Sequence, residues 1–118
     1  MRSLSFIAVA VLGIARVAAA NEVPDTHPPF VTKRIARLAE EPVTGPPARV
    51  LRYTFRGATV YYVPGPCCDM PSEIYDAAGH QHQCFPEAPA MDADGTCADF
   101  YANRRDEVLV WVDARKPR

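Results

Sequence analysis

The first twenty residues constrain the fold of this chain most, because they indicate the compartment in which it folds. Arg2 is followed by an apolar run from Phe6 to Ala15 and then by small residues that end at Ala20. This order, with an apolar run too short to span a bilayer, is typical of a cleavable signal peptide rather than of a buried N-terminal helix. We therefore expect cleavage after Ala20 and a secreted or periplasmic product.

The rest of the chain is predicted to be one small soluble monomer. No cysteine lies near the cleavage site and no later segment is long and apolar, so we expect neither a lipid anchor nor a membrane span. The chain carries 13 Lys and Arg against 14 Asp and Glu, a formal net charge of −1. Its basic residues are scattered rather than gathered in one patch, which argues against nucleic-acid binding.

The four cysteines predict covalent cross-links. Cys67, Cys68, Cys84 and Cys97 give an even count, which in a short exported chain is typical of disulfides. A bond between the neighbours Cys67 and Cys68 would close a strained eight-membered ring, so we expect each of them to pair with Cys84 or Cys97. Two alternatives stay open: a metal–thiolate site that includes His80, His82 and Cys84, and a redox pair at Cys67 and Cys68.

Hydrophobic alternation predicts a small antiparallel sheet. Residues 49–56 alternate apolar and polar side chains and residues 59–63 are rich in β-branched and aromatic ones, which indicates a hairpin. Residues 72–76 and 80–84 predict a second, shorter hairpin. Residues 108–112 are apolar on both faces, and such a strand is expected to be central in the sheet.

Two helices are predicted outside these strands. In the proline-rich arm 21–48, a helix over residues 30–40 has an apolar stripe that favours docking on the domain proper, residues 49–118. Residues 86–97 are expected to form a loop, and Asp99 to cap a short helix over residues 100–105. The predicted fold class is α+β: a small antiparallel β-sheet with one or two short helices, stapled by two disulfides.

Several motifs together resemble a known family. They are Val60-Tyr61-Tyr62-Val63-Pro64, Cys67-Cys68-Asp69, Ile74-Tyr75-Asp76, Asp94-Gly95-Thr96-Cys97-Ala98-Asp99-Phe100 and Trp111. Across residues 49–113 this pattern resembles the small exported bacterial domains grouped as domain of unknown function 6970, many of them lipoproteins. The resemblance implies an extracytoplasmic setting and supports disulfides, but it implies no activity. Residues 86–89 depart from a glycine-rich stretch of that family, and Ala98 stands where the family tends to have proline.

We predict a non-enzymatic binding module that needs no cofactor and whose partner is an unidentified protein or envelope ligand. Candidate binding residues are Asp69, Tyr75 and Asp76, which follow the cysteine pair in the sequence. Exposed tyrosines would provide an aromatic patch for a partner or a glycan. Residues 85–96 would alternatively present a protease-inhibitor loop.

The alternative function is a small cation-dependent enzyme or metal-binding protein that uses Asp69, Asp94 and Asp99, with His80. Asp92, Asp94 and Asp99 are weak metal candidates, because alternate carboxylates near Gly95 partly match a calcium loop. No glutamate closes that loop, and turn and helix-cap roles are the favoured interpretation of these residues. No serine, threonine or cysteine lies in a nucleophile motif, so we predict no catalytic residue.

Overall fold

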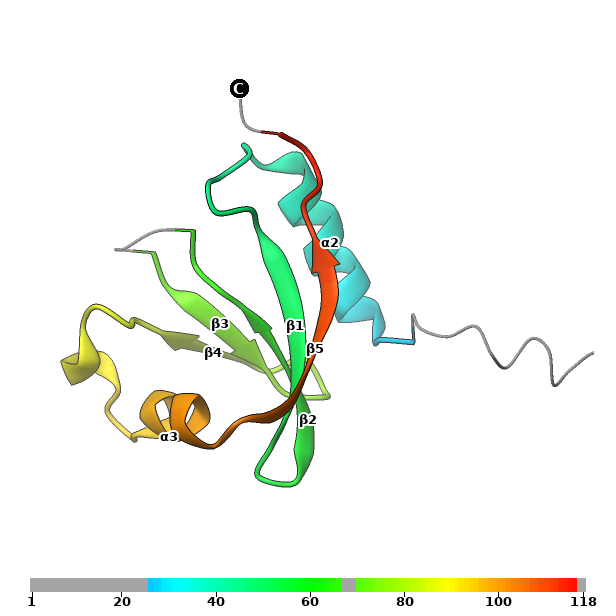
Figure 1. The fold of residues 1–118 in the computed structure, drawn as a ribbon. Helices are drawn as coiled ribbons and strands as arrows, with labels where there is room; N and C mark the ends of the chain where they lie inside the picture. The colour runs from blue at the N-terminus through cyan, green and yellow to red at the C-terminus, as the bar shows by residue number, and fades with distance from the viewer. Residues whose placement is uncertain (1–25, 67–69, 117–118) are drawn as a thin grey trace, which may run out of the picture.

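A computed structural model describes residues 26–66 and 70–116. Five strands form one antiparallel sheet in the order β4-β3-β2-β1-β5. The strands are β1 (Arg49–Phe55), β2 (Ala58–Val63), β3 (Ser72–Tyr75), β4 (Gln81–Cys84) and β5 (Arg105–Val112). The helices are α2 (Pro29–Glu40) and α3 (Thr96–Asn103), with one 3-10 turn over Pro89–Met91. The α+β class is therefore confirmed (Figure 1).

Both predicted hairpins are present. β1 pairs with β2, and β3 pairs with β4, each pair being antiparallel. The first hairpin turns at Arg56 and Gly57, which have φ values of 54° and 74°. Positive φ at both central residues is the geometry that matches the right-handed twist of the two strands.

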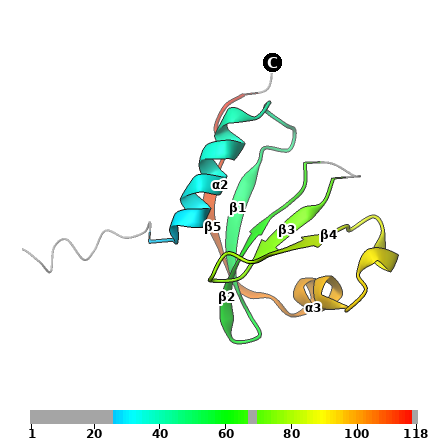
Figure 2. The same ribbon diagram turned by 180° about the vertical axis from the view of Figure 1, so that it is seen from behind.

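The sheet buries side chains on both faces. Along β1 and β2, side chains alternate between a cluster under α3, which includes Leu51, Tyr53 and Tyr62, and a cluster under α2, which includes Val50 and Tyr61. The two helices therefore cover opposite faces, as the front and back views show (Figures 1 and 2). This three-layer arrangement explains why so short a chain has two apolar clusters.

Helix α2 of the proline-rich arm packs on the sheet, as its apolar stripe favoured. Val31 and Leu38 are 2% and 6% exposed and join the cluster under α2. Arg34 forms a two-bond ion pair with Glu73 of β3, with N–O distances of 2.8 and 3.0 Å. The helix is thus held by apolar burial and by a charge pair at the sheet surface.

The predicted central position of residues 108–112 is wrong, because β5 is an edge strand that pairs only with β1 within the described ranges. Its α2 face is covered, since Val110 and Trp111 pack against the α2 cluster. Its other face is open, and Leu109 and Val112 are 54% and 42% exposed. The apolar run therefore reflects one covered face and one open face.

The second helix was also misplaced by the sequence pattern. α3 begins at Thr96, so part of the expected loop 86–97 is helical. Asp99 lies in the first turn of α3 rather than before it, and accepts hydrogen bonds from Arg56 and Asn103. Gly95, with φ of 73°, precedes the helix instead.

Part of the prediction falls outside the described residues. The signal peptide 1–20 and the residues Cys67, Cys68 and Asp69 lie there. Within the described ranges, no helix is both long and apolar enough to cross a membrane.

If α2 is part of the fold, Leu38→Ala should lower the free energy of unfolding by about 2–4 kcal/mol, the usual cost of truncating a buried leucine. Urea unfolding measures this change. Lys33→Ala, which truncates an exposed side chain of the same helix, is the control and should change stability little. Equal effects of both substitutions would show that α2 does not dock.

Candidate binding site

The Cys84–Cys97 disulfide ties α3 to the edge strand β4. Both cysteines are buried, and they are 13 positions apart in the sequence. The expected pairing, in which Cys67 and Cys68 each bond one of these two, is therefore wrong. The described residues contain this one disulfide rather than two. Sequence reasoning weighed ring strain at the neighbouring pair, but it had no means of seeing that α3 places Cys97 against β4.

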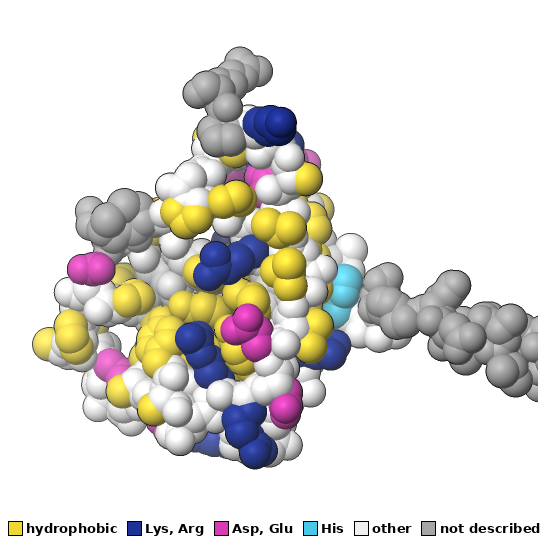
Figure 3. Space-filling model, in the orientation of Figure 1, with side chains coloured by type: hydrophobic (Ala, Val, Ile, Leu, Met, Phe, Trp, Pro, Cys, Tyr) yellow, Lys and Arg dark blue, Asp and Glu magenta, His cyan; other side chains and the backbone are white. Residues whose placement is uncertain are grey.

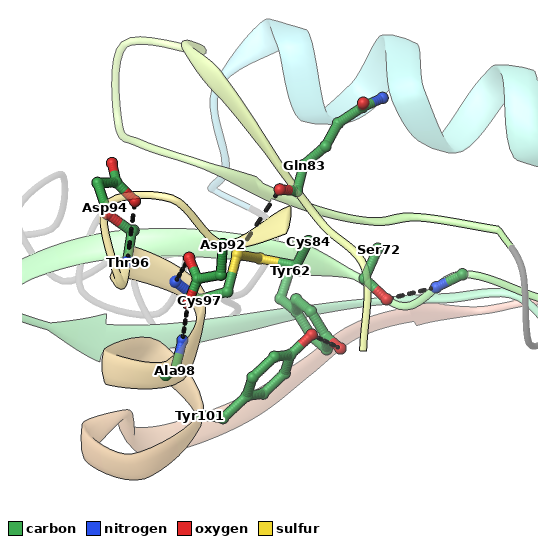
Figure 4. The surroundings of a disulfide bond; sticks show 11 residues. Tyr62, Ser72, Gln83, Cys84, Asp92, Asp94, Thr96, Cys97, Ala98 and Tyr101 are labelled. Atoms are coloured by element: carbon green, nitrogen blue, oxygen red, sulfur yellow. Dashed lines mark hydrogen bonds between the residues drawn. A yellow bond between two sulfur atoms is a disulfide. The ribbon is translucent and has the colours of Figure 1, made fainter. Parts of the chain in front are cut away.

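Two carboxylates hold the first turn of α3. Asp92 accepts hydrogen bonds from the backbone N–H groups of Cys97 and Ala98, each at 3.0 Å, and Asp94 accepts one from Thr96. Figure 4 shows both carboxylates beside the disulfide. These acceptors satisfy N–H groups that have no partner within a helix, and negative charge is favourable at a helix N-terminus. Hydrogen bonds from Thr96 lower the pKa of Asp94.

Fixed in this way, α3 directs three side chains toward the sheet. Phe100 is fully buried and packs edge-on against Tyr53 and Phe55. Tyr101 lies beside Tyr62, with their hydroxyl oxygens 3.1 Å apart. Arg104, just after the helix, places its guanidinium 5.0 to 5.7 Å from the ring centroids of four aromatic residues, Tyr53, Tyr62, Phe100 and Tyr101. Such cation–π contacts orient the arginine as well as stabilising it.

A hollow of about 370 Å³ lies between α3 and β5 on this face. It is lined by Arg49, Leu51, Tyr53, Tyr62, Tyr101, Arg104, Glu107 and Leu109. Figure 3 shows this face, with an apolar area bordered by basic and acidic side chains. We call these eight residues the aromatic hollow. Its size lies within the range of small-ligand sites, and an apolar floor with a few polar groups is their usual composition.

The polar groups of the hollow differ in how far they are already paired. The hydroxyl of Tyr53 donates to Glu107 at 2.6 Å. Burial, followed by this hydrogen bond, raises the pKa of Tyr53 to about 12. By contrast, none of the ion pairs found within the described ranges involves Arg49 or Arg104. The hollow therefore offers two guanidinium groups against one carboxylate that is already engaged.

The predicted binding residues do not come together in this hollow. Tyr75 lies near α2 on the other face, where its hydroxyl donates to Glu73 at 2.7 Å. Burial, and then that hydrogen bond, raises the pKa of Tyr75 to about 12. Asp76 accepts backbone hydrogen bonds from Ala78 and His80 in the β3–β4 turn. Asp69 lies outside the described residues.

Two of the three weak metal candidates lie together and the third lies apart. Asp92 and Asp94 lie with His82 in a group whose ligand atoms are within 4.8 Å of one another. In the described part of the chain Asp99 belongs to no such group and binds Arg56 instead. Asp92 and Asp94 both accept hydrogen bonds at the N-terminal end of α3. The helix dipole gives this end a partial positive charge, which disfavours binding of a cation between the two carboxylates. The sulfur atoms of Cys84 and Cys97 are bonded to each other, so they offer no thiolate.

Sequence reasoning identified the tyrosines but missed Arg49, Tyr101 and Arg104. Tyr53, Tyr61 and Tyr62 are all buried, so the exposed aromatic patch is smaller than expected. The helix predicted over residues 100–105 contains Tyr101 and Arg104, but α3 ends at Asn103 and Arg104 follows it in extended backbone. Arg104 reaches the hollow through its contacts with Tyr53 of β1 and Tyr62 of β2, and local spacing in the sequence does not report such contacts.

The disulfide connectivity can be tested by cleavage after glutamate, under non-reducing conditions. Cuts after Glu73 and Glu87 place the pair Cys67 and Cys68, Cys84, and Cys97 on three different peptides. We expect mass spectrometry to find the Cys84 and Cys97 peptides as one species that separates on reduction. The double variant Cys84→Ser, Cys97→Ser should lose about 3 kcal/mol of stability. A linked species that joins either cysteine to the Cys67 peptide would contradict the structure.

The raised pKa of Tyr53 predicts a loss of stability at alkaline pH. A tyrosine ionises at about 10 in an unfolded chain, and Tyr53 does so at about 12 in the fold. The folded state therefore binds its proton more tightly, and this contribution is complete below pH 10 and lost as the pH rises toward 12. Urea unfolding at pH 8, 10 and 11 should show a smaller alkaline loss for Tyr53→Phe than for the unchanged chain. Identical pH profiles would contradict the burial of this hydroxyl.

Comparisons with known proteins place this arrangement in a family without assigning it a role. No curated protein and no solved structure matches the chain. A family model described as a domain of unknown function matches residues 36–113, from within α2 to just after β5. The matched segment includes the whole sheet, the disulfide and α3. The chain therefore belongs to the family of the domain of unknown function DUF6970.

Proposed function

We propose that this chain is an exported, non-enzymatic binding module that takes a carboxylate of its ligand in the aromatic hollow. One observation carries the proposal: Arg49 and Arg104 line the hollow, and no ion pair within the described ranges involves either. A planar guanidinium matches the two oxygens of a carboxylate, so the hollow offers charge and shape for that group. Export is supported by the predicted leader and by a disulfide, which persists in oxidising compartments.

The preformed state of the hollow supports binding rather than catalysis. Arg104 is held by four aromatic rings and α3 is held by the disulfide, so the Arg104 guanidinium needs little ordering when a ligand arrives. The polar groups that line the hollow are arginines, tyrosines and one glutamate, without a histidine, cysteine or serine. This set binds and orients a ligand more readily than it supplies a nucleophile.

The cation-dependent alternative has weaker support. It needs Asp94 and Asp99 in one site, yet Asp94 accepts a hydrogen bond at the start of α3 and Asp99 pairs with Arg56. A protease-inhibitor role has less support as well, because the 3-10 turn and the Asp92 contacts shorten the free part of the loop 85–96.

The proposal can be tested with the smallest ligand that carries the chemistry, N-acetyl-L-glutamic acid α-amide. Its neutral glutamine counterpart is the matched control ligand. We expect millimolar titration of the ¹⁵N-labelled exported chain to shift the Arg104 side-chain N–H and the Tyr101 amide with the acid only. Arg104→Gln should abolish these shifts, whereas Arg37→Gln, on the exposed face of α2, should preserve them. Equal shifts with both ligands, or none at the hollow, would contradict the proposal.

A further inference from the structure

The outer edge of β5 is available for another strand. β5 ends the sheet order, so the edge facing away from β1 has no strand partner among the described residues. At eight residues β5 is also the longest strand in the sheet. A long edge strand presents a row of N–H and C=O groups that pairs readily with another extended chain.

The charges that normally prevent such pairing are confined to the start of β5. Arg105, Asp106 and Glu107 are charged and exposed, and Asp106 has a φ of 59° at a shift in register with β1. Charged side chains of this kind on an edge strand oppose strand addition. The second half, residues 108–112, has no charge, proline or glycine. Three of the large exposed apolar side chains lie on it: Val108, Leu109 and Val112.

A second irregularity joins this open half to the aromatic hollow. Leu51 pairs with Leu109, Val50 with Trp111 and Arg49 with Val112, so Val110 is one extra residue. In a regular strand, residues three apart point to opposite faces. The extra residue instead places Leu109 and Val112 on the same face of the sheet, beside the hollow. It is the face of Leu51 and Arg49, with which they pair. The edge and the hollow thus form one continuous surface.

We propose that a partner polypeptide adds an extended segment to β5 along residues 108–112 and places an acidic side chain between Arg49 and Arg104. This inference rests on the proposed function and names its ligand class. Main-chain hydrogen bonds would supply affinity, and the hollow, as a pocket for one side chain, would supply specificity. The two guanidinium groups, which form no ion pair with any described residue, make an acidic side chain the complementary one.

A second copy of this chain fits the surface less well. Paired through β5, it would bring Asp106 and Glu107 as the acidic residues of that strand. Glu107 already accepts the hydroxyl of Tyr53, and Asp106 is held in the bulge. Neither carboxylate is free to reach the guanidinium groups, so we assign the surface to a different polypeptide.

The probe is a random 12-residue peptide library displayed on phage and selected on the exported, disulfide-bonded chain. We expect a consensus with one acidic residue among alternating apolar positions. Changing that residue to its amide should weaken the peptide's Kd about tenfold or more, because a guanidinium that the bound peptide shields from water loses its charged partner. Arg104→Gln should have a similar effect, and Arg37→Gln should have none. The peptide-side change leaves the fold of the protein untouched, so a folding defect cannot imitate the result.

Strand addition itself is tested at the backbone amides of β5 and of the peptide. Binding of the selected peptide should slow hydrogen exchange at amides within residues 108–112, and N-methylation of alternate peptide amides should abolish binding. Peptides without an acidic consensus, or without added protection on β5, would overturn the inference. So would a concentration-dependent dimer in light scattering that protects the same amides without peptide. If only the glutamic acid probe binds the hollow, the proposed function stands and strand addition is rejected.

Discussion

The bond between Cys84 and Cys97 determines how much of the sheet's second face is covered. It anchors α3 at β4, one end of the sheet, and the helix then packs Phe100 over β1 and β2. The helix ends at Asn103 and the chain enters β5 at Arg105, so α3 leaves Leu109 and Val112 of β5 exposed. The uncovered strip between α3 and β5 becomes the aromatic hollow. The anchor, together with the carboxylate caps, fixes Tyr101 and Arg104 along its border.

The two faces of the sheet are stabilised by different means. On one face, the twelve residues of α2 bury Val31 and Leu38 and add the Arg34–Glu73 ion pair. On the other, a covalent bond and two carboxylate caps hold α3, and Phe100 of this helix packs against the rings of Tyr53, Phe55 and Tyr62. A small domain with limited core often needs such a cross-link.

Local patterns predicted the fold well and the site poorly, for a physical reason. Alternation in 49–56 and the stripe in 30–40 report which side chains are buried, and that information is contained in a few neighbouring residues. The disulfide partner, the edge position of β5 and the hollow depend on contacts between segments far apart in sequence. The sequence around Trp111 has the same apolar pattern whether a second strand or a helix covers it in the fold. Asp92 is a weak metal candidate in the sequence, yet in the structure it caps α3. It can do so because this helix begins earlier in the chain than the sequence pattern predicts.

The extra residue at Val110 has a consequence for how this domain can change in evolution. Leu109 and Val112 share a face only because the strand accommodates Val110 as an extra residue; regular pairing of β5 at its present length would turn Val112 toward the other face. Loss of one residue there would instead give a regular strand that keeps both side chains on the open face. The open surface is therefore set by the register of β5 against β1 more than by the identity of any one side chain on it.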